Sequence, residues 1–209
     1  MTKQAVKNQL ANKANGQANK PVSPEQTIRH YLQQMAPEIK KALPKHLDAD
    51  RLTRIAMTTI RQTPKLLECN IQSLLAAVMQ SAQLGLEPNI LGQAYIIPYG
   101  SEAQFIIGYR GMIDLARRSG HIESIYAHPV YSKDEFEYEY GLDPKLRHKP
   151  AMGDRGEFIG AYGVAKFKDG GYHFEFMPKS EIDKRRGRSK AKNSGPWVTD
   201  YEEMACKTV

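Results

Sequence analysis

The sequence contains little cysteine and no long apolar run, and both absences exclude classes of protein. Its 209 residues include two cysteines, Cys69 and Cys206, whose spacing matches no zinc or redox motif. We therefore expect two reduced thiols with structural roles. No stretch approaches the roughly 18 apolar residues of a membrane span, and the opening MTKQAVKNQL lacks the apolar segment of a signal peptide. The sequence therefore predicts a cytoplasmic protein without membrane contact.

The usual signatures of catalysis are also missing. The histidines form no i,i+4 pair and no HExxH motif. There is no GxxxxGK[ST] phosphate loop and no GxSxG nucleophile elbow. Glu135, Glu137 and Glu139 alternate along a predicted strand, which leaves open a metal-dependent nuclease site beside the more common interpretation of a solvated strand edge. We predict a protein that is not an enzyme, with no catalytic residues and no bound metal.

Positive charge is abundant and unevenly distributed. The chain has 30 Lys and Arg against 23 Asp and Glu, a net charge of +7. Residues 1–20 hold four lysines and no acid, and residues 179–192 hold seven bases and two acids. The remainder is slightly acidic, so the positive charge is concentrated in two patches. Such patches favour polyphosphate ligands, because each neutralised phosphate releases condensed counterions.

Residues 1–22 and the chain that follows differ in composition. The first 22 residues are rich in Asn, Gln, Lys and Ala, which predicts a disordered basic arm. We expect a single domain over 23–209. A capping box of Ser23 and Gln26 opens it. Three amphipathic helices are predicted: 24–43 with a kink or a split at Pro37, a second capped by Asp48, and 71–84 ending at Gly85.

Apolar residues then recur with period 2, which predicts strands. Further strands are expected over 122–131 and 135–140, with two hairpins, 93–99 with 103–109 and 158–168 with 172–177. A helix over 111–119 is expected between the first hairpin and the strand over 122–131. A Thr199–Glu202 capping box predicts a last helix. We predict an α+β fold: a helical N-terminal part, an antiparallel β-sheet packed on a helix, and a basic C-terminal helical element.

The basic run KSEIDKRRGRSKAKNSGPW ends at the single tryptophan of the chain. Glycine and serine should make this run mobile, and mobile cations beside a stacking aromatic are typical of single-strand binding. The predicted phosphate contacts are Lys179, Lys184, Arg185, Arg186, Arg188, Lys190 and Lys192. Trp197 is predicted either to stack on a base or to anchor the last helix in the core.

A second set of candidate DNA-binding residues surrounds the inserted helix. Arg110, Arg117 and Arg118 are candidates for a second row of phosphate contacts. For Arg117 and Arg118, the alternative is a favourable interaction with the dipole of that helix, worth about 0.3–1 kcal/mol. Three tyrosines are candidates for base stacking or for the core: Tyr95, Tyr99 and Tyr109.

Three long blocks of the sequence resemble the signature blocks of the RecT family of phage and prophage single-strand annealing proteins. They are LGLEPNILGQAYIIPYG (84–100), QFIIGYRGMIDLARRSG (104–120) and GPWVTDYEEMACKT (195–208). The resemblance runs from about Leu43 to the end of the chain, with the blocks in the same order and spacing. Members of this family usually continue with another basic helical stretch and an acidic tail, so we expect the annealing domain to be truncated at its C-terminus.

The resemblance implies ATP-independent binding of single-stranded DNA and annealing of complementary strands in phage-type homologous recombination. It implies no cofactor, with Mg²⁺ only as a modulator of DNA binding, and a core similar to that of the Rad52 and Red-beta annealing proteins. The implied partners are single-stranded DNA and the annealed duplex, further copies in a ring or helical filament, a 5′-to-3′ exonuclease and a host single-strand-binding protein. Two alternatives stay open: a metal-dependent nuclease and a protein that coats single strands without annealing them.

Overall fold

A computed structural model describes residues 23–45 and 47–209, and the predicted basic arm, 1–22, lies outside the described residues. The single domain predicted over 23–209 stays a prediction, and the contacts within the chain divide it between Gly111 and Met112 into two compact units. The physical reason is that the buried apolar side chains form separate clusters, one in the first unit and two in the second.

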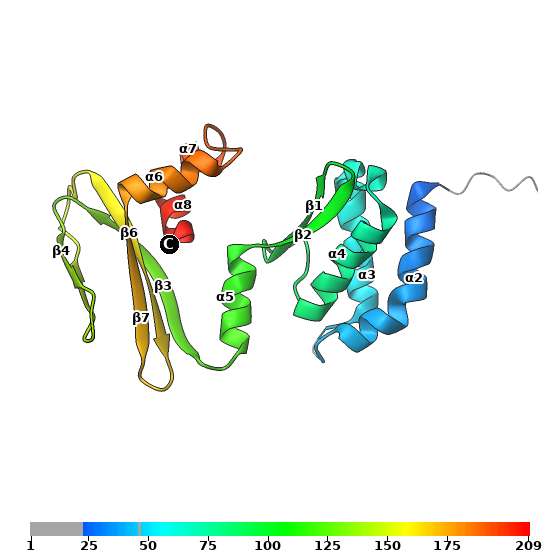
Figure 1. Cartoon of the computed structure of the whole chain (residues 1–209), viewed down its shortest axis with the longest axis horizontal. Helices are drawn as coiled ribbons and strands as arrows, with labels where there is room; N and C mark the ends of the chain where they lie inside the picture. The colour runs from blue at the N-terminus through cyan, green and yellow to red at the C-terminus, as the bar shows by residue number, and fades with distance from the viewer. Residues whose placement is uncertain (1–22, 46) are drawn as a thin grey trace, which may run out of the picture. The chain divides into compact units, whose positions relative to one another are not determined.

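The first unit consists of helices and one β-hairpin (Figure 1). Its elements are α2 (Pro24–Ala42), α3 (Ala49–Gln62), the 3-10 helix η1 (Pro64–Glu68), α4 (Ile71–Leu84), β1 (Ala94–Tyr99) and β2 (Glu102–Ile107). The predicted caps are confirmed: Ser23 and Gln26 form a capping box, Asp48 accepts a hydrogen bond at the start of α3, and Gly85 ends α4 in the left-handed conformation. Pro37 lies inside α2, which continues to its end without being split.

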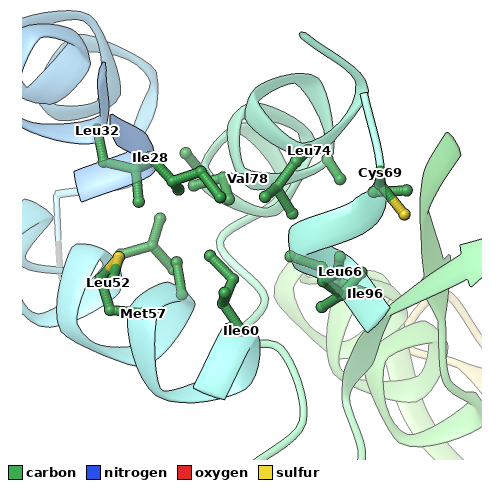
Figure 2. Packing of buried hydrophobic residues seen from close by; sticks show 14 of the residues in the cluster. Ile28, Leu32, Leu52, Met57, Ile60, Leu66, Cys69, Leu74, Val78 and Ile96 are labelled. Atoms are coloured by element: carbon green, nitrogen blue, oxygen red, sulfur yellow. The ribbon is translucent and has the colours of Figure 1, made fainter. Parts of the chain in front are cut away.

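The core of the first unit forms where the apolar faces of the helices meet one face of the hairpin (Figure 2). The buried side chains include Ile28 and Leu32 of α2, Leu52 and Ile60 of α3, Leu74 and Val78 of α4, and Ile96 of β1. Because successive residues of a strand point to opposite faces, β1 buries Ala94 and Ile96 and leaves Tyr95 and Tyr99 exposed. The hairpin therefore presents tyrosines on its outer face.

The second unit is built around an antiparallel sheet with strand order β3–β6–β7. Its elements are β3 (Ile122–Tyr131), β4 (Glu135–Glu139), β5 (Lys145–Lys149), β6 (Phe158–Phe167), β7 (Tyr172–Pro178), α6 (Lys179–Arg188), α7 (Pro196–Thr199) and α8 (Tyr201–Thr208), and α5 (Tyr109–Arg118) crosses the division between the units. Strand β5 was not predicted from the sequence. Its five residues, KLRHK, contain one apolar side chain, so alternation gives no signal, and pairing with β4 holds it in place.

Two clusters of buried side chains cover the two faces of this sheet. On one face, Ala161 of β6 packs with Ile182 of α6 and Trp197 of α7. On the other face, Tyr162 and Val164 pack against the β4–β5 hairpin. Figure 1 shows the sheet between these two layers, with α6, α7 and α8 on one side and β4 on the other. Helix α6 and the hairpin are therefore separated by the thickness of the sheet.

The predicted capping box of the last helix is wrong. Thr199 is the last residue of the short helix α7, and its hydroxyl donates to the carboxylate of Asp200. Helix α8 begins afterwards, at Tyr201, and Asp200 provides no side-chain cap. The chain turns at α7 because this turn places Trp197 in the core, a tertiary contact that the capping pattern does not encode.

The two cysteines agree with the sequence-based expectation. Cys69 and Cys206 are free thiols, and burial raises the pKa of each. A raised pKa lowers the fraction of reactive thiolate, as expected for thiols with structural roles. Within the described residues, no helix has the length and apolar character needed to cross a membrane.

Candidate nucleic-acid interface

The basic segment folds as helix α6 over Lys179–Arg188, where a mobile run was predicted. Ile182 is fully buried and attaches one side of the helix to the sheet. The acid Glu181 lies in the first turn and three arginines lie in the last, an arrangement that interacts favourably with the helix dipole. These contacts outweigh the helix-weakening effect of Gly187, and glycine is one of the residues from which the sequence predicts a mobile run.

The inner side of α6 is held by Tyr201 of α8. The Tyr201 hydroxyl donates to Asp183 Oδ1 over 2.7 Å, and Lys179 Nζ donates to Asp183 Oδ2 over 2.9 Å. Lys179 Nζ and Arg186 Cζ lie 5.8 and 5.6 Å from the centre of the Tyr201 ring. The hydrogen bond from Tyr201 lowers the pKa of Asp183, and burial raises the pKa of Tyr201. Lys179 and Arg186, which were predicted as phosphate contacts, thus lie against Tyr201.

The outer side of α6 presents the remaining cations of the helix. Lys184 Nζ lies 3.3 Å from Glu181 in an exposed i,i+3 pair. Such a pair contributes little to stability, so Lys184 can easily bind another anion in place of Glu181. Arg185 and Arg188 are exposed, and among the described residues neither forms an ion pair or a side-chain hydrogen bond. They lie three residues apart, so both project from the same face of the helix. This pair is therefore positive charge that is available for binding.

The turn after α6 carries the last two predicted cations, and Trp197 follows it. Lys190 and Lys192 are exposed, and the carbonyl of Lys192 accepts a 2.9 Å hydrogen bond from Arg186 Nε. Trp197 is only 7% exposed and lies 6.0 Å from the Tyr201 ring, measured between centroids. The structure therefore favours the core-anchor interpretation of Trp197, because a base cannot stack on a buried ring.

In the first unit, the hairpin and the start of α5 bring three predicted residues together. Arg110 Nε donates to the Tyr109 hydroxyl over 3.2 Å, and Arg110 Nη1 donates to the carbonyl of Leu91 over 3.5 Å. Tyr95 and Tyr109 are 42% and 36% exposed. A cation thus lies beside two partly exposed aromatic rings, the combination that binds phosphates and stacks bases in single-strand binding proteins. We call these three residues the hairpin cluster: Tyr95, Tyr109 and Arg110.

Two glycines allow the hairpin cluster to form. A Cβ atom at Gly108 would lie 2.3 Å from the carbonyl oxygen of Gly92, and one at Gly111 would lie 2.1 Å from that of Gln93. The backbone N–H of Gly108 donates to Gln93 over 2.8 Å. The start of α5 therefore rests directly on the preceding loop, and only residues without a Cβ fit there. The two residues between the glycines belong to the cluster.

The remaining predicted residues lie outside these two groups. Tyr99 is at the other end of β1, opposite Glu102. Arg118 Nη2 lies 2.7 Å from Asp114 in an i,i+4 pair, and Arg117 is exposed in the last turn of α5. Both arginines lie where the helix dipole favours cations, as the alternative interpretation expects, and a role in phosphate binding stays a prediction.

No sequence pattern indicated a buried polar network in the second unit. The carboxylate of Asp134 is fully buried and accepts hydrogen bonds from Arg155 Nε at 3.0 Å and Arg155 Nη2 at 2.6 Å. His148 Nε2 lies 3.0 Å from the same carboxylate, and the backbone N–H groups of Tyr131 and Ala151 donate to it, each over 2.9 Å. The hydrogen bonds from Arg155 are the main cause of a strongly lowered pKa of Asp134. Its side-chain partners are 14 and 21 residues away, so no local spacing indicates the contact.

The acidic strand that suggested a nuclease is a charge-paired hairpin. Glu135, Glu137 and Glu139 of β4 face three cations of β5: Lys149, Arg147 and Lys145. The Glu135 carboxylate lies 2.9 Å from Lys149 Nζ. Among the described residues, no group of three or more His, Cys, Asp or Glu side chains is placed to hold a metal ion. The solvated-edge interpretation therefore describes β4.

The chain is similar in sequence to known proteins. The RecT family model matches residues 50–209. The chain is 49% identical to Protein RecT of Escherichia coli strain K12 over 183 residues, an alignment that covers 83% of this chain and 68% of RecT. It is also 28% identical over 217 residues to the uncharacterised protein YqaK of Bacillus subtilis strain 168, an alignment that covers all of this chain and 72% of YqaK.

Proposed function

The chain belongs to the RecT family of recombination proteins, and from this premise we propose how it binds single-stranded DNA and anneals complementary strands. The outer side of α6 holds DNA phosphates through Arg185 and Arg188, and Lys184, Lys190 and Lys192 extend the basic surface. The observation that carries this proposal is that Arg185 and Arg188 are exposed and form no ion pair with any residue that the structure describes, while Ile182 and Tyr201 hold the opposite side of the helix.

Annealing on this surface requires no covalent chemistry. Two complementary strands repel each other, and a basic surface that neutralises phosphates reduces that repulsion. Contacts to phosphates carry no sequence information, so Watson–Crick pairing selects the partner strand and little base preference is expected. The reaction therefore needs neither ATP nor a cofactor, and Mg²⁺ modulates DNA binding only by competing for phosphates.

The hairpin cluster is a second DNA contact in this proposal. Tyr95 and Tyr109 offer partly exposed rings, and Arg110 lies beside them. A base stacked on an aromatic side chain contributes about 1–3 kcal/mol, and such stacking tolerates any sequence. Tyr99, Arg117 and Arg118 remain candidates for weaker contacts.

Membership of the family also supports proposals about assembly and partners. Several copies on one strand, as a ring or filament, multiply weak contacts through effective concentration. A 5′-to-3′ exonuclease would supply the single strands, a host single-strand-binding protein would compete for them, and the annealed duplex would be the product. We place this activity in the bacterial cytoplasm, with a sheet-and-helix core similar to that of Rad52 and Red-beta.

The decisive experiment compares annealing rates of complementary oligonucleotides without ATP at two salt concentrations. We expect the wild-type chain to accelerate annealing, and the Arg185→Ala/Arg188→Ala variant to bind single strands about tenfold more weakly, which corresponds to about 0.7 kcal/mol for each cation. The slope of log affinity against log salt should decrease by about 1.4, because each phosphate contact on a single strand contributes about 0.7.

The matched control is Lys145→Ala/Lys149→Ala, which removes the same charge from β5, where both lysines pair with carboxylates. This control should keep both the affinity and the salt slope. Equal effects of the two variants would contradict a specific role of α6. Tight binding with slowed annealing would instead identify a protective coat, and degradation of labelled DNA with Mg²⁺ would identify a nuclease.

A further inference from the structure

The second unit contains a cavity that the proposed function does not use. It has a volume of about 230 Å³ and lies on the hairpin side of the sheet, away from α6. Its lining residues are His128, Pro129, His148, Pro150, Arg155 and Tyr162. The volume is below the roughly 300–1,000 Å³ of ordinary small-molecule pockets, so the cavity fits one small chemical group.

Arg155 provides a fixed hydrogen-bond donor at this cavity. Its Nε and Nη2 atoms bond to Asp134, and Nη2 also donates to the carbonyl of Pro129 over 3.2 Å. The guanidinium carbon lies 4.2 Å from the centre of the Tyr131 ring. These contacts fix the plane of the guanidinium and leave Nη1 without a hydrogen-bond partner among the described residues. A donor held in place in this way loses little entropy when it binds a ligand.

The cavity offers a second donor, His128, whereas His148 is already engaged. His128 lies on β3 opposite Tyr162, and the centroids of the two rings are 5.8 Å apart. Its ring nitrogens form no hydrogen bond with another described residue. His148 uses both ring nitrogens, one with Asp134 and one with the Tyr162 hydroxyl. His148 therefore forms part of the wall, and His128 is available for a ligand.

The chemistry of these groups selects an oxyanion. Asp134 bonds directly to two lining residues and already accepts five hydrogen bonds, so its charge is largely compensated. A second carboxylate, Glu202, interacts with Arg155 electrostatically, and it accepts a hydrogen bond from the Tyr131 hydroxyl. Arginine is well suited to phosphate because its planar guanidinium is always charged and carries several donors. We propose that this cavity binds a phosphate group through Arg155 Nη1 and His128. The group could belong to free phosphate or to a phosphodiester of DNA, and the proposal does not depend on the role of α6.

The test follows the imidazole Cε1–H signals of the folded chain by NMR during titration with inorganic phosphate. We expect the His128 signal to shift and saturate, and sodium chloride at the same ionic strength to leave it unchanged. His128→Ala, followed through the signal of His148 in the cavity wall, should weaken phosphate binding about tenfold, the loss expected for one charge-assisted hydrogen bond of about 1.4 kcal/mol. The exposed His128 can be replaced without breaking the Asp134 network, and Trp197 fluorescence verifies that the variant is folded.

The control is His173→Ala, which removes an exposed histidine from β7 of the same sheet. Phosphate should still bind to this variant and shift the His128 signal. Arg155→Lys keeps the charge beside Asp134 but removes Nη1, and it should also lose phosphate binding. A His128 signal that does not saturate, or that responds equally to chloride, would overturn the proposal.

A second titration distinguishes the source of the phosphate. A single-stranded oligonucleotide that shifts the His128 signal in the Arg185→Ala/Arg188→Ala variant identifies a DNA phosphodiester as the ligand. A shift with inorganic phosphate alone identifies a site for the free ion. The readout is separate from annealing, so failure of the α6 proposal would leave this result interpretable.

Discussion

At the residue scale, the second unit depends on a single buried carboxylate. Asp134 precedes β4, and its partners come from β5 and from the loop before β6. Removing one partner of a buried ion pair destabilises the folded state, because the other charge stays buried without compensation. The network therefore attaches the β4–β5 hairpin and the following loop to the end of β3.

The first prediction concerns this carboxylate. Asp134→Asn should lower the free energy of unfolding by about 3–5 kcal/mol, because it leaves the Arg155 charge uncompensated. Chemical denaturation followed by Trp197 fluorescence measures this loss. Asp143→Asn replaces an exposed carboxylate of the same unit and should change stability by less than about 1 kcal/mol. Similar losses for both variants would contradict the role of the buried network.

The same carboxylate predicts a dependence on pH. The folded state lowers the pKa of Asp134, whereas the unfolded value is about 3.9. A depressed pKa stabilises the folded state above the unfolded pKa, and this contribution decreases as pH falls below about 4. The wild-type stability should therefore fall more steeply between about pH 5 and pH 2 than that of Asp134→Asn. Parallel curves for the two proteins would show that Asp134 is not the group responsible.

The third residue-scale prediction concerns Tyr201. Tyr201→Phe keeps the ring under Lys179 and Arg186 but removes the hydrogen bond to Asp183. We expect a loss of about 1 kcal/mol in the free energy of unfolding and a rise in the pKa of Asp183 towards its ordinary value, measured by carbon NMR. Tyr172→Phe removes a hydroxyl that bonds to Pro144 elsewhere in this unit. That control should leave the pKa of Asp183 unchanged, and an equal rise would contradict the assignment.

At the element scale, local signals predicted most helices and strands, and the failures have identifiable causes. The helices of the first unit and both predicted hairpins are present because caps, glycines and apolar periods are local features. Strand β5 was missed because it has a single apolar residue. The predicted start of α8 was wrong because the turn before this helix places Trp197 in the core.

The start of α5 provides the element-scale prediction. Gly111→Ala would place a Cβ 2.1 Å from the carbonyl oxygen of Gln93, so the helix must move, at a cost of about 1–3 kcal/mol. Gly187→Ala in α6 meets no atom within 4 Å and should stabilise that helix by up to about 1 kcal/mol. Thermal unfolding compares the two variants. Equal and small changes in the midpoint would show that α5 does not rest on the loop.

At the scale of the whole molecule, each unit has its own core, which predicts separate unfolding transitions. Leu74 is buried in the first unit, and Leu74→Ala should destabilise that unit by about 2–5 kcal/mol. Trp197 lies in the second unit and reports on that unit. In denaturant, far-UV circular dichroism should show an earlier transition for this variant, whereas the Trp197 midpoint should stay near that of the wild type. Coincident shifts of both signals would instead indicate one cooperative unit.

The sequence supplied the candidate site residues, and their role in DNA binding stays a prediction. The basic run and the family blocks identified the cations and tyrosines, because composition and motif are properties of the chain itself. They could not show which of those cations are available for binding DNA. Lys179 and Arg186 contact Tyr201, whereas Arg185 and Arg188 project outward. Helical spacing alone leaves that difference undecided, because it does not reveal which face of α6 packs against the sheet.

The sequence alone determined the family, the charge pattern and most of the secondary structure, because these depend on residue type and on neighbours a few positions away. The tertiary structure decided which of these residues are available for binding. Trp197 lies in the core, and Arg185 and Arg188 are exposed. Asp134 bonds to His148 and Arg155, which lie 14 and 21 residues further along the chain. Those outcomes depend on how distant segments bury apolar surface together, which no local pattern of the chain specifies.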